Sequence, residues 1–308
     1  MPEGATYRGR FAPSPTGPLH FGSLIAAVGS YLDAHRHGGD WLVRIEDIDP
    51  PREKSGAAKA ILKSLDLHGF EWAGAVLYQS TRSDAYEGAL RELAARGATY
   101  PRTCSRRDIA KRQPPGARGL RYPGTCREGP QRRRAPAALR VRTNDALISF
   151  VDRVQGRISV ALESDDGDFV VRRKDGLFAY QLAVVVDDAA QGITDVVRGV
   201  DLLDSTPRQL HLQQLLGLKP LRYAHLPIAV DERGQKLSKQ TLAAPLDARS
   251  PADALVRALA FLGQEPPADL QHADVRGVWA WAQAHWRLDK VSGTQRPAAA
   301  FGSAQRLP

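Results

Sequence analysis

Two short segments, about 200 residues apart, carry residue types suited to binding phosphate groups. The first is RFAPSPTGPLHFGS, residues 10–23, which places His20 and Gly22 where a predicted strand gives way to a predicted helix. The N–H groups of a helix N-terminus attract phosphate, so His20 can add a donor and Gly22 lets a ligand approach the backbone. For His20 taken alone, a structural histidine buried at the turn is the better explanation.

The second segment is Lys236-Leu237-Ser238-Lys239-Gln240, in a polar loop after the last predicted strand. Two lysines three positions apart can clamp a polyphosphate and stabilise the charge that develops during in-line displacement at phosphorus. Lysine pairs are common on protein surfaces, and by itself the segment is more simply explained as a solvated loop.

The elements around the first segment predict a supersecondary unit. Residues 7–11 predict a short strand and 12–17 a Pro/Ser/Gly turn. Apolar residues at helical spacing between 24 and 32 predict a helix, which the glycines at 38 and 39 end. Residues 41–45 then predict a second buried strand. Strand–helix–strand within about 40 residues is the βαβ unit that opens a parallel, doubly wound sheet, so we expect an α/β fold.

Further elements follow from the same apolar spacing and from turn residues. We expect helices over 55–67, 82–96 and 206–216, and a helical tail after Pro251 in which Trp279, Trp281 and Trp286 act as core anchors. Strands are predicted over 139–141, an alternating region from 148 to 162, 168–171, the near-continuous apolar run 180–186, 195–197 and 225–230. Between 102 and 136 the pattern degrades into basic residues with Pro and Gly, so we interpret 96–174 as an insertion.

Composition and charge narrow the class of protein. The 308 residues are 43% apolar and 25% charged, with two cysteines, which excludes a disulfide framework. No apolar run is long enough for a membrane span or a secretory signal, so we expect a cytoplasmic protein. The net charge is +9, and residues 96–142 hold 14 Lys and Arg against two acids. This basic segment suits a polyanion, although a solvated insertion explains the charge equally well.

Together, in this order and spacing, residues 10–23 and 236–240 resemble the HIGH-type and KMSKS-type signatures of class I aminoacyl-tRNA synthetases. Three further stretches are similar to motifs of the glutamyl branch of that family: RIEDID at 44–49, YQLAVVVDD at 180–188 and DVVRG at 195–199. The resemblance implies a Rossmann-like catalytic domain over 1–250, interrupted by the basic insertion at 96–174, and a helical C-terminal tail over 251–308.

Within that branch the chain is most similar to the glutamyl-Q tRNA(Asp) synthetases, a family of short paralogues. About 68 residues follow Gln240, fewer than the helical anticodon-binding region of full-length glutamyl-tRNA synthetases needs. The family implies ATP-dependent activation of L-glutamate and its transfer to queuosine in the anticodon of tRNA(Asp), with no obligate protein partner. Two alternatives stay open: a truncated glutamyl-tRNA synthetase that charges the tRNA 3′ end, and a non-catalytic RNA-binding protein on a synthetase scaffold.

The resemblance also implies roles for individual residues. Arg10 and Arg198 would form bidentate pairs with the carboxylates of glutamate, and Glu46 would bind its ammonium group. The same pocket would include Phe11, Ala12, Pro13, Ser14 and Tyr180. The ATP site, with Mg²⁺ on the leaving pyrophosphate, would include His20, Gly22, Lys236, Ser238 and Lys239, of which His20 and Lys239 would contact the transition state. The simpler explanation for residues 44–47 is an ordinary strand end with a surface ion pair.

A zinc site in the insertion is the one family feature that is damaged here. The resemblance implies a set of four zinc ligands in the pattern Cys-x-Cys, Tyr, Cys. The last three correspond to Cys104, Tyr122 and Cys126 in this sequence, but Arg102 stands at the first ligand position. Arginine has no lone pair to donate, so a fourth ligand would have to be water or a distant side chain. The alternative is two free cysteines in a loop that packing alone holds together.

Overall fold

A parallel pair of strands with a helix between them forms the first half of the central sheet. β1 (Arg8–Phe11) pairs in parallel with β2 (Asp40–Ile45), β3 (Leu77–Tyr78) continues the order β1-β2-β3, and α1 (Phe21–Arg36) connects β1 to β2. Gly39 must be glycine, because an added Cβ would lie 2.2 Å from the carbonyl oxygen of Tyr7. The predicted βαβ unit is confirmed.

The structure is a computed structural model that describes residues 6–111, 121–130, 135–230, 246–247, 249–293 and 296–297.

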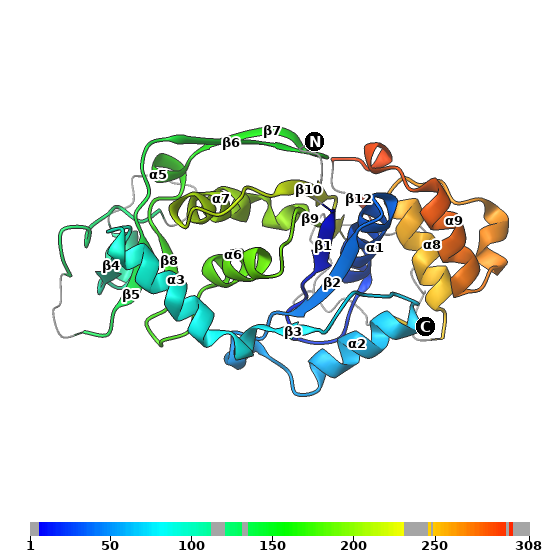
Figure 1. Ribbon diagram of the computed structural model, residues 1–308, viewed down its shortest axis with the longest axis horizontal. Helices are drawn as coiled ribbons and strands as arrows, with labels where there is room; N and C mark the ends of the chain where they lie inside the picture. The colour runs from blue at the N-terminus through cyan, green and yellow to red at the C-terminus, as the bar shows by residue number, and fades with distance from the viewer. Residues whose placement is uncertain are drawn as a thin grey trace.

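A second sheet has the order β7-β6-β10-β9, in which β10 is parallel to both β6 and β9. The N–H of Thr194 donates to the carbonyl of Arg8 at 2.9 Å, which brings β9 beside β1 and joins the two sheets (Figure 1). The bounds of these strands are β6 (Leu147–Asp152), β7 (Gly156–Ala161), β9 (Asp195–Gly199) and β10 (Arg222–Leu226). The predicted last strand is in fact two strands, β10 and β11 (Ala229–Val230).

The prediction of a strand over 180–186 is wrong, because these residues begin the helix α6 (Tyr180–Ala190). A continuous apolar run fits a buried helix as well as a buried strand, and this run is buried against α7 (Thr206–Leu215) and α3 (Ser83–Ala95). The difference matters for function, since a helix beginning at Tyr180 carries Asp187 and Asp188 into the core.

The described residues of the segment 96–174 form a separate antiparallel sheet and one long hairpin. The sheet has the order β4-β5-β8 and lies at one end of the molecule, whereas the hairpin β6-β7 runs back to pair with β10 (Figure 1). The bounds here are β4 (Thr99–Arg102), α4 (Arg106–Ala110), β5 (Ala138–Val141), α5 (Leu162–Asp165) and β8 (Phe169–Arg172). The hairpin therefore connects the segment 96–174 to the central sheet.

Helices α8 (Pro251–Phe261) and α9 (Val275–His285) form the opposite end of the molecule (Figure 1). They share one apolar core with α1 and with α2 (Ala57–Leu67). Trp279 and Trp286 are buried in this core and Trp281 is half-buried against it, which confirms their role as anchors. The remaining elements are β12 (Arg296–Pro297) and the 3-10 turns Pro50–Arg52, Gln79–Thr81, Val200–Ser205, Ala268–His272 and Leu288–Lys290. Among the described residues, no helix is both long and apolar enough to span a membrane.

Candidate functional site

A cavity of about 700 Å³ opens where the carboxyl ends of β1, β2, β9 and β10 meet the N-terminus of α1. In open α/β sheets, ligands bind at this edge. The predicted residues that line the cavity are Arg10, Phe11, Ala12, Pro13, Ser14, His20, Gly22, Glu46, Tyr180 and Arg198. The other three residues predicted for the ATP site, Lys236, Ser238 and Lys239, lie outside the described part of the chain.

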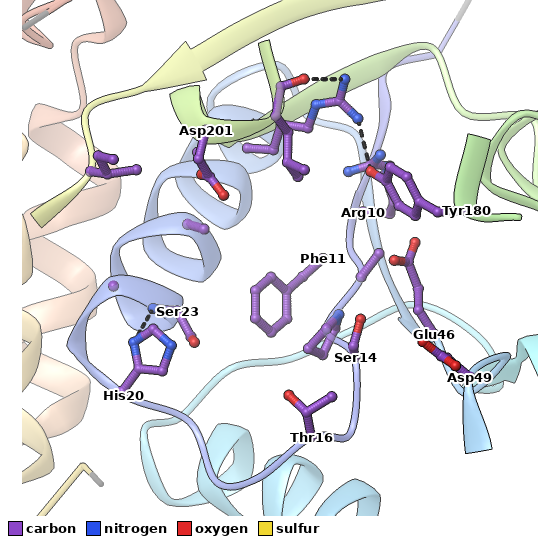
Figure 2. Close-up of a pocket in the computed structure, with 18 of the residues that line it drawn as sticks. Arg10, Phe11, Ser14, Thr16, His20, Ser23, Glu46, Asp49, Tyr180 and Asp201 are labelled. Carbon is purple, nitrogen blue, oxygen red and sulfur yellow. Dashed lines mark hydrogen bonds between the residues drawn. The ribbon is translucent and has the colours of Figure 1, made fainter. Parts of the chain in front are cut away.

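The cavity has two chemically different sides (Figure 2). Arg10, Glu46 and Tyr180 lie together on one side, and His20 lies on the other, at the end of α1. Phe11 lies between the two groups. One side is therefore rich in charge, and the other offers helix N–H groups, as a site for an amino acid and a nucleotide requires.

Asp188 in α6 joins two arginines from neighbouring strands. Its Oδ1 lies 3.1 Å from Nε of Arg10 and 2.8 Å from Nη1 of Arg44, and its Oδ2 lies 3.4 Å from Nη2 of Arg10. Burial alone would raise the pKa of the Asp188 carboxyl, but the two guanidinium groups outweigh it and hold that pKa below its usual value. Asp188 thus accepts hydrogen bonds from Nε and Nη2 of Arg10. A ligand can bind only the remaining N–H groups of this guanidinium.

Glu46 follows β2 and is an acidic group on the charged side of the cavity. Its Oε1 lies 3.5 Å from Nη2 of Arg44, whose side chain is 0% exposed. Burial raises the pKa of the Glu46 carboxyl, and the nearby Arg44 and Arg10 offset this rise only in part. An ordinary surface ion pair therefore does not describe residues 44–47. A ligand ammonium group would stabilise the ionised form of Glu46.

Arg198, at the end of β9, is 5% exposed and is held by several hydrogen bonds. Its Nε donates to Nε2 of His225 at 3.1 Å, and its Nη1 donates to the Tyr180 hydroxyl at 3.2 Å. Its Nη2 donates to the side chains of Thr206 and Gln209, both at 2.9 Å. With its Nε and Nη2 engaged, Arg198 can offer a ligand a single contact through Nη1 rather than the predicted bidentate pair. Arg198 forms no ion pair with any residue that the structure describes, so its buried charge calls for an anionic ligand.

His20 is the N-cap of α1. Its Nδ1 accepts a hydrogen bond from the backbone N–H of Ser23 at 3.4 Å, which places the proton of the neutral imidazole on Nε2. The ring is thereby fixed at the mouth of a 16-residue helix, whose N-terminus attracts anions. A structural role for His20 and a contact with phosphate are therefore compatible.

Several polar residues of the site were missed by the sequence reasoning. Asp49, Arg173 and Asp201 also line the cavity, and Nη1 of Arg173 lies 2.9 Å from Oδ1 of Asp49. Asp49 belongs to the RIEDID stretch, so its place beside Glu46 was a usable signal. Arg173 comes from the end of the insertion, and no local pattern links it to this edge of the sheet.

Cys104, Tyr122 and Cys126 do come together in the insertion, and all three are buried. The two sulfur atoms are 3.7 Å apart, and the Cys104 sulfur lies 3.7 Å from the Tyr122 hydroxyl oxygen. At the fourth position, Arg102 donates to the Cys104 carbonyl, and the guanidinium of Arg140 lies 4.0 Å from the centre of the Tyr122 ring. Three donors beside two cations do not fit structural zinc. In the described ranges, no group of three or more His, Cys, Asp or Glu side chains could hold a metal ion.

The comparisons with known proteins agree with this geometry. Residues 6–282 match the model for the catalytic domain of class I tRNA synthetases (E and Q). The chain is 58% identical to a glutamyl-Q tRNA(Asp) synthetase from Dechloromonas aromatica, over 92% of this chain and 95% of that protein. It is 53% identical to one from Pseudomonas aeruginosa, over 93% and 96%.

Among solved structures, the fold is similar to a glutamate-tRNA synthetase from Elizabethkingia anophelis. The TM-score is 0.79 at 25% identity, and the match covers 96% of this chain and 70% of that one. A glutamate tRNA ligase from Elizabethkingia meningosepticum, in complex with its amino acid, matches with a TM-score of 0.77 at 25% identity, over 96% and 68%. The chain therefore belongs to the family of class I tRNA synthetases (E and Q).

Proposed function

We propose that this protein activates L-glutamate with ATP and transfers the glutamyl group to queuosine in the anticodon of tRNA(Asp). The observation that carries the first half is the charge pattern of the cavity. Arg198 is buried without a counter-ion among the described residues, and Glu46 stands near Arg10 on the same side of the cavity. L-Glutamate supplies two carboxylates for the arginines and an ammonium group for Glu46.

The reaction begins with attack of the glutamate α-carboxylate on the α-phosphorus of ATP, which enters as its Mg²⁺ complex. An acyl–phosphate bond forms, the bond to pyrophosphate breaks, and pyrophosphate leaves. No enzyme nucleophile is required, so the protein acts by orienting the substrates and by stabilising charge. We propose that His20, which lines the cavity, and the N-terminus of α1 bind phosphate oxygens, and that Lys239 and Lys236 join them.

The choice of acceptor rests on the relatives. Proteins named glutamyl-Q tRNA(Asp) synthetase match this chain at 52–58% identity over nearly their whole length. A tRNA substrate suits the basic segment 96–142, although Arg132, Arg133 and Arg134 within it lie outside the described residues. We also propose that the enzyme is cytoplasmic. Zinc has no part in the proposal, because Arg102 takes the place of a ligand.

Glutamate-dependent exchange of labelled pyrophosphate into ATP tests the activation step. We expect exchange with the wild-type protein and a loss of at least about 100-fold in kcat/KM for glutamate in Arg198→Ala, because a buried charge contact is removed. Arg222→Ala is the matched control, since Arg222 lies on the neighbouring strand and does not line the cavity. A wild-type protein without exchange would favour the non-catalytic RNA-binding alternative.

A further inference from the structure

Behind Arg198 lies a pair of buried polar side chains that do not line the cavity. His225 in β10 is 0% exposed and Asp152, the last residue of β6, is 2% exposed. Nδ1 of His225 lies 2.6 Å from Oδ2 of Asp152, and the opposite ring nitrogen, Nε2, accepts the Nε–H of Arg198 at 3.1 Å. The three side chains thus form a row that ends at the proposed glutamate site.

We propose that Asp152 and His225 are positioning residues for Arg198. Asp152 accepts the Nδ1 proton of His225, which fixes the tautomer whose Nε2 lone pair receives Arg198. The inference rests on the proposed function, because it gives a role to a residue of the glutamate site. Neither residue touches the cavity, so both act through Arg198.

The surrounding hydrogen bonds fit only this tautomer. The Thr206 hydroxyl accepts from Nη2 of Arg198 at 2.9 Å, so its own proton can point to Nε2 of His225, 3.2 Å away. A proton on Nε2 would instead face the Nε–H of Arg198, and the lone pair of Nδ1 would face the Asp152 carboxylate. Two donors would then oppose each other in a dry interior, which is costly.

A doubly protonated His225 is disfavoured for the same reason. Burial lowers the pKa of the His225 imidazole, and the positive charges of Arg198 and Arg10 lower it further, while Asp152 opposes them only in part. Asp152 itself is a carboxylate, since the hydrogen bonds from His225 and Gln155 outweigh burial and lower its pKa to about 2. The pair is thus a neutral imidazole bonded to a carboxylate.

Asp152 is held in place by the backbone. Its Oδ1 accepts the N–H groups of His225, Val154 and Gln155 at 3.1, 3.0 and 2.9 Å. Val154 and Gln155 lie at the turn of the β6-β7 hairpin, and His225 lies in β10, which pairs with β6 at this point. The hairpin belongs to the segment 96–174, so this segment supplies a residue on which the geometry of Arg198 depends.

The backbone contacts make Asp152→Asn a sharp test. Three N–H groups require an oxygen at the Oδ1 position, so the new amide nitrogen must face Nδ1 of His225. The ring then has to carry its proton on Nε2, opposite Arg198. As in other buried Asp–His pairs, replacing the carboxylate by an amide imposes the wrong tautomer. We expect KM for glutamate to rise by about 10- to 100-fold in pyrophosphate exchange. KM for ATP should stay within about twofold.

Asp168→Asn is the matched control. Asp168 is 1% exposed and also accepts several hydrogen bonds, from Tyr100, Arg127 and Thr143, but it lies in the β4-β5-β8 region away from Arg198. It should lose stability without a change in KM for glutamate. Equal KM values for glutamate in the Asp152→Asn and Asp168→Asn variants would overturn the proposal, as would a parallel rise in KM for ATP.

Two further measurements separate positioning from general damage. In a His225→Gln background there is no tautomer to set, so adding Asp152→Asn should change KM for glutamate by less than about twofold. Additive effects of the two substitutions would contradict the pairing.

If the Asp152→Asn variant does not fold, long-range nitrogen–proton NMR of histidine-labelled wild-type protein replaces the kinetic test. The signal that disappears in His225→Gln should report a neutral ring protonated on Nδ1, and an Nε2-protonated ring would refute the proposal. Wild-type protein that fails to activate glutamate would instead refute the proposed function.

Discussion

Arg10 reaches the cavity while held by Asp188, whose Oδ1 lies 3.1 Å from its Nε. The same carboxylate oxygen lies 2.8 Å from Nη1 of Arg44, so one anion from α6 serves cations on β1 and β2. Because all three side chains are buried, the charge network is rigid, and it fixes the direction of Arg10 before any substrate arrives.

Asp188→Asn should therefore cost both stability and glutamate affinity. Removing one partner of a buried ion pair leaves uncompensated charge, and we expect a loss of about 3–5 kcal/mol in the free energy of unfolding. Urea denaturation measures it. A variant within about 1 kcal/mol of wild type would show that Arg10 and Arg44 do not depend on this carboxylate.

The same network predicts a pH dependence of stability. The folded-state pKa of Asp188 is lowered, so its contribution is present above the unfolded pKa of about 4 and is lost as pH falls through the folded value. Asp152, with a pKa of about 2, acts in the same direction. The unfolding free energy of wild type should thus fall between about pH 4 and pH 2, and the Asp188→Asn variant should have a shallower slope. Identical slopes would contradict the assignment.

Amino acid choice should follow from the buried charge of Arg198, which forms no ion pair with the described residues. Glutamine lacks the second carboxylate, and sites built around a specific polar contact reject the analogue without it by ~10⁴ or more. Aspartate keeps both charges but is one methylene short, so it cannot reach Arg10 and Arg198 at once. We expect pyrophosphate exchange with glutamate, weak exchange with aspartate and almost none with glutamine. Comparable rates for glutamine and glutamate would break the assignment of the pocket.

Lys239 lies outside the described residues, and its role is a prediction from the KLSKQ segment. Lys239→Ala should reduce adenylate formation by roughly 10²- to 10³-fold, as for the loss of one preorganised charge contact. Binding of glutamate, measured by calorimetry without ATP, should change much less. An unimpaired exchange rate would remove Lys239 from the active site.

The Cys104, Tyr122 and Cys126 cluster should be stable without metal. Treatment with EDTA should leave the Tm of wild type unchanged, because Arg102 offers no lone pair. Arg102→Cys supplies a fourth donor and should bind about one zinc per chain, with a Tm that EDTA lowers. Arg102→Ala is the control that removes the cation without adding a donor. Wild-type protein that retains one zinc per chain after dialysis would contradict this interpretation.

Much of the site followed from sequence because its residues stand in contiguous stretches at strand ends. Residues 10–14 and Glu46 follow or end strands of the first sheet, and Arg198 lies at the end of β9 in the second sheet, which adjoins β1. The carboxyl ends of such neighbouring strands meet at one edge. The strand pattern and the family resemblance were therefore enough to predict that these residues line one cavity. The departure from the family's zinc pattern was also visible in the sequence, because Arg102 stands at a ligand position.

The supporting residues were not predictable in the same way. Asp188 lies just beyond the strand predicted over 180–186, whereas the helix that forms there places it against Arg10, 178 residues away in the chain. Asp152 and His225 are 73 residues apart and were read as parts of ordinary strands. A polar residue buried in an apolar strand, as in Tyr-Ala-His-Leu at 223–226, was the only available signal. Its partner depends on strand order, which local patterns do not give.

The acceptor of glutamate is the most direct test of the proposed function. Labelled glutamate and ATP should be incubated with tRNA(Asp) in three forms: intact, lacking the 3′-terminal adenosine, and carrying guanine in place of queuosine. We expect alkali-labile label on the first two and none on the third. Label that requires the 3′ adenosine and ignores queuosine would contradict the proposal, because glutamate would then be attached to the 3′ end of the tRNA.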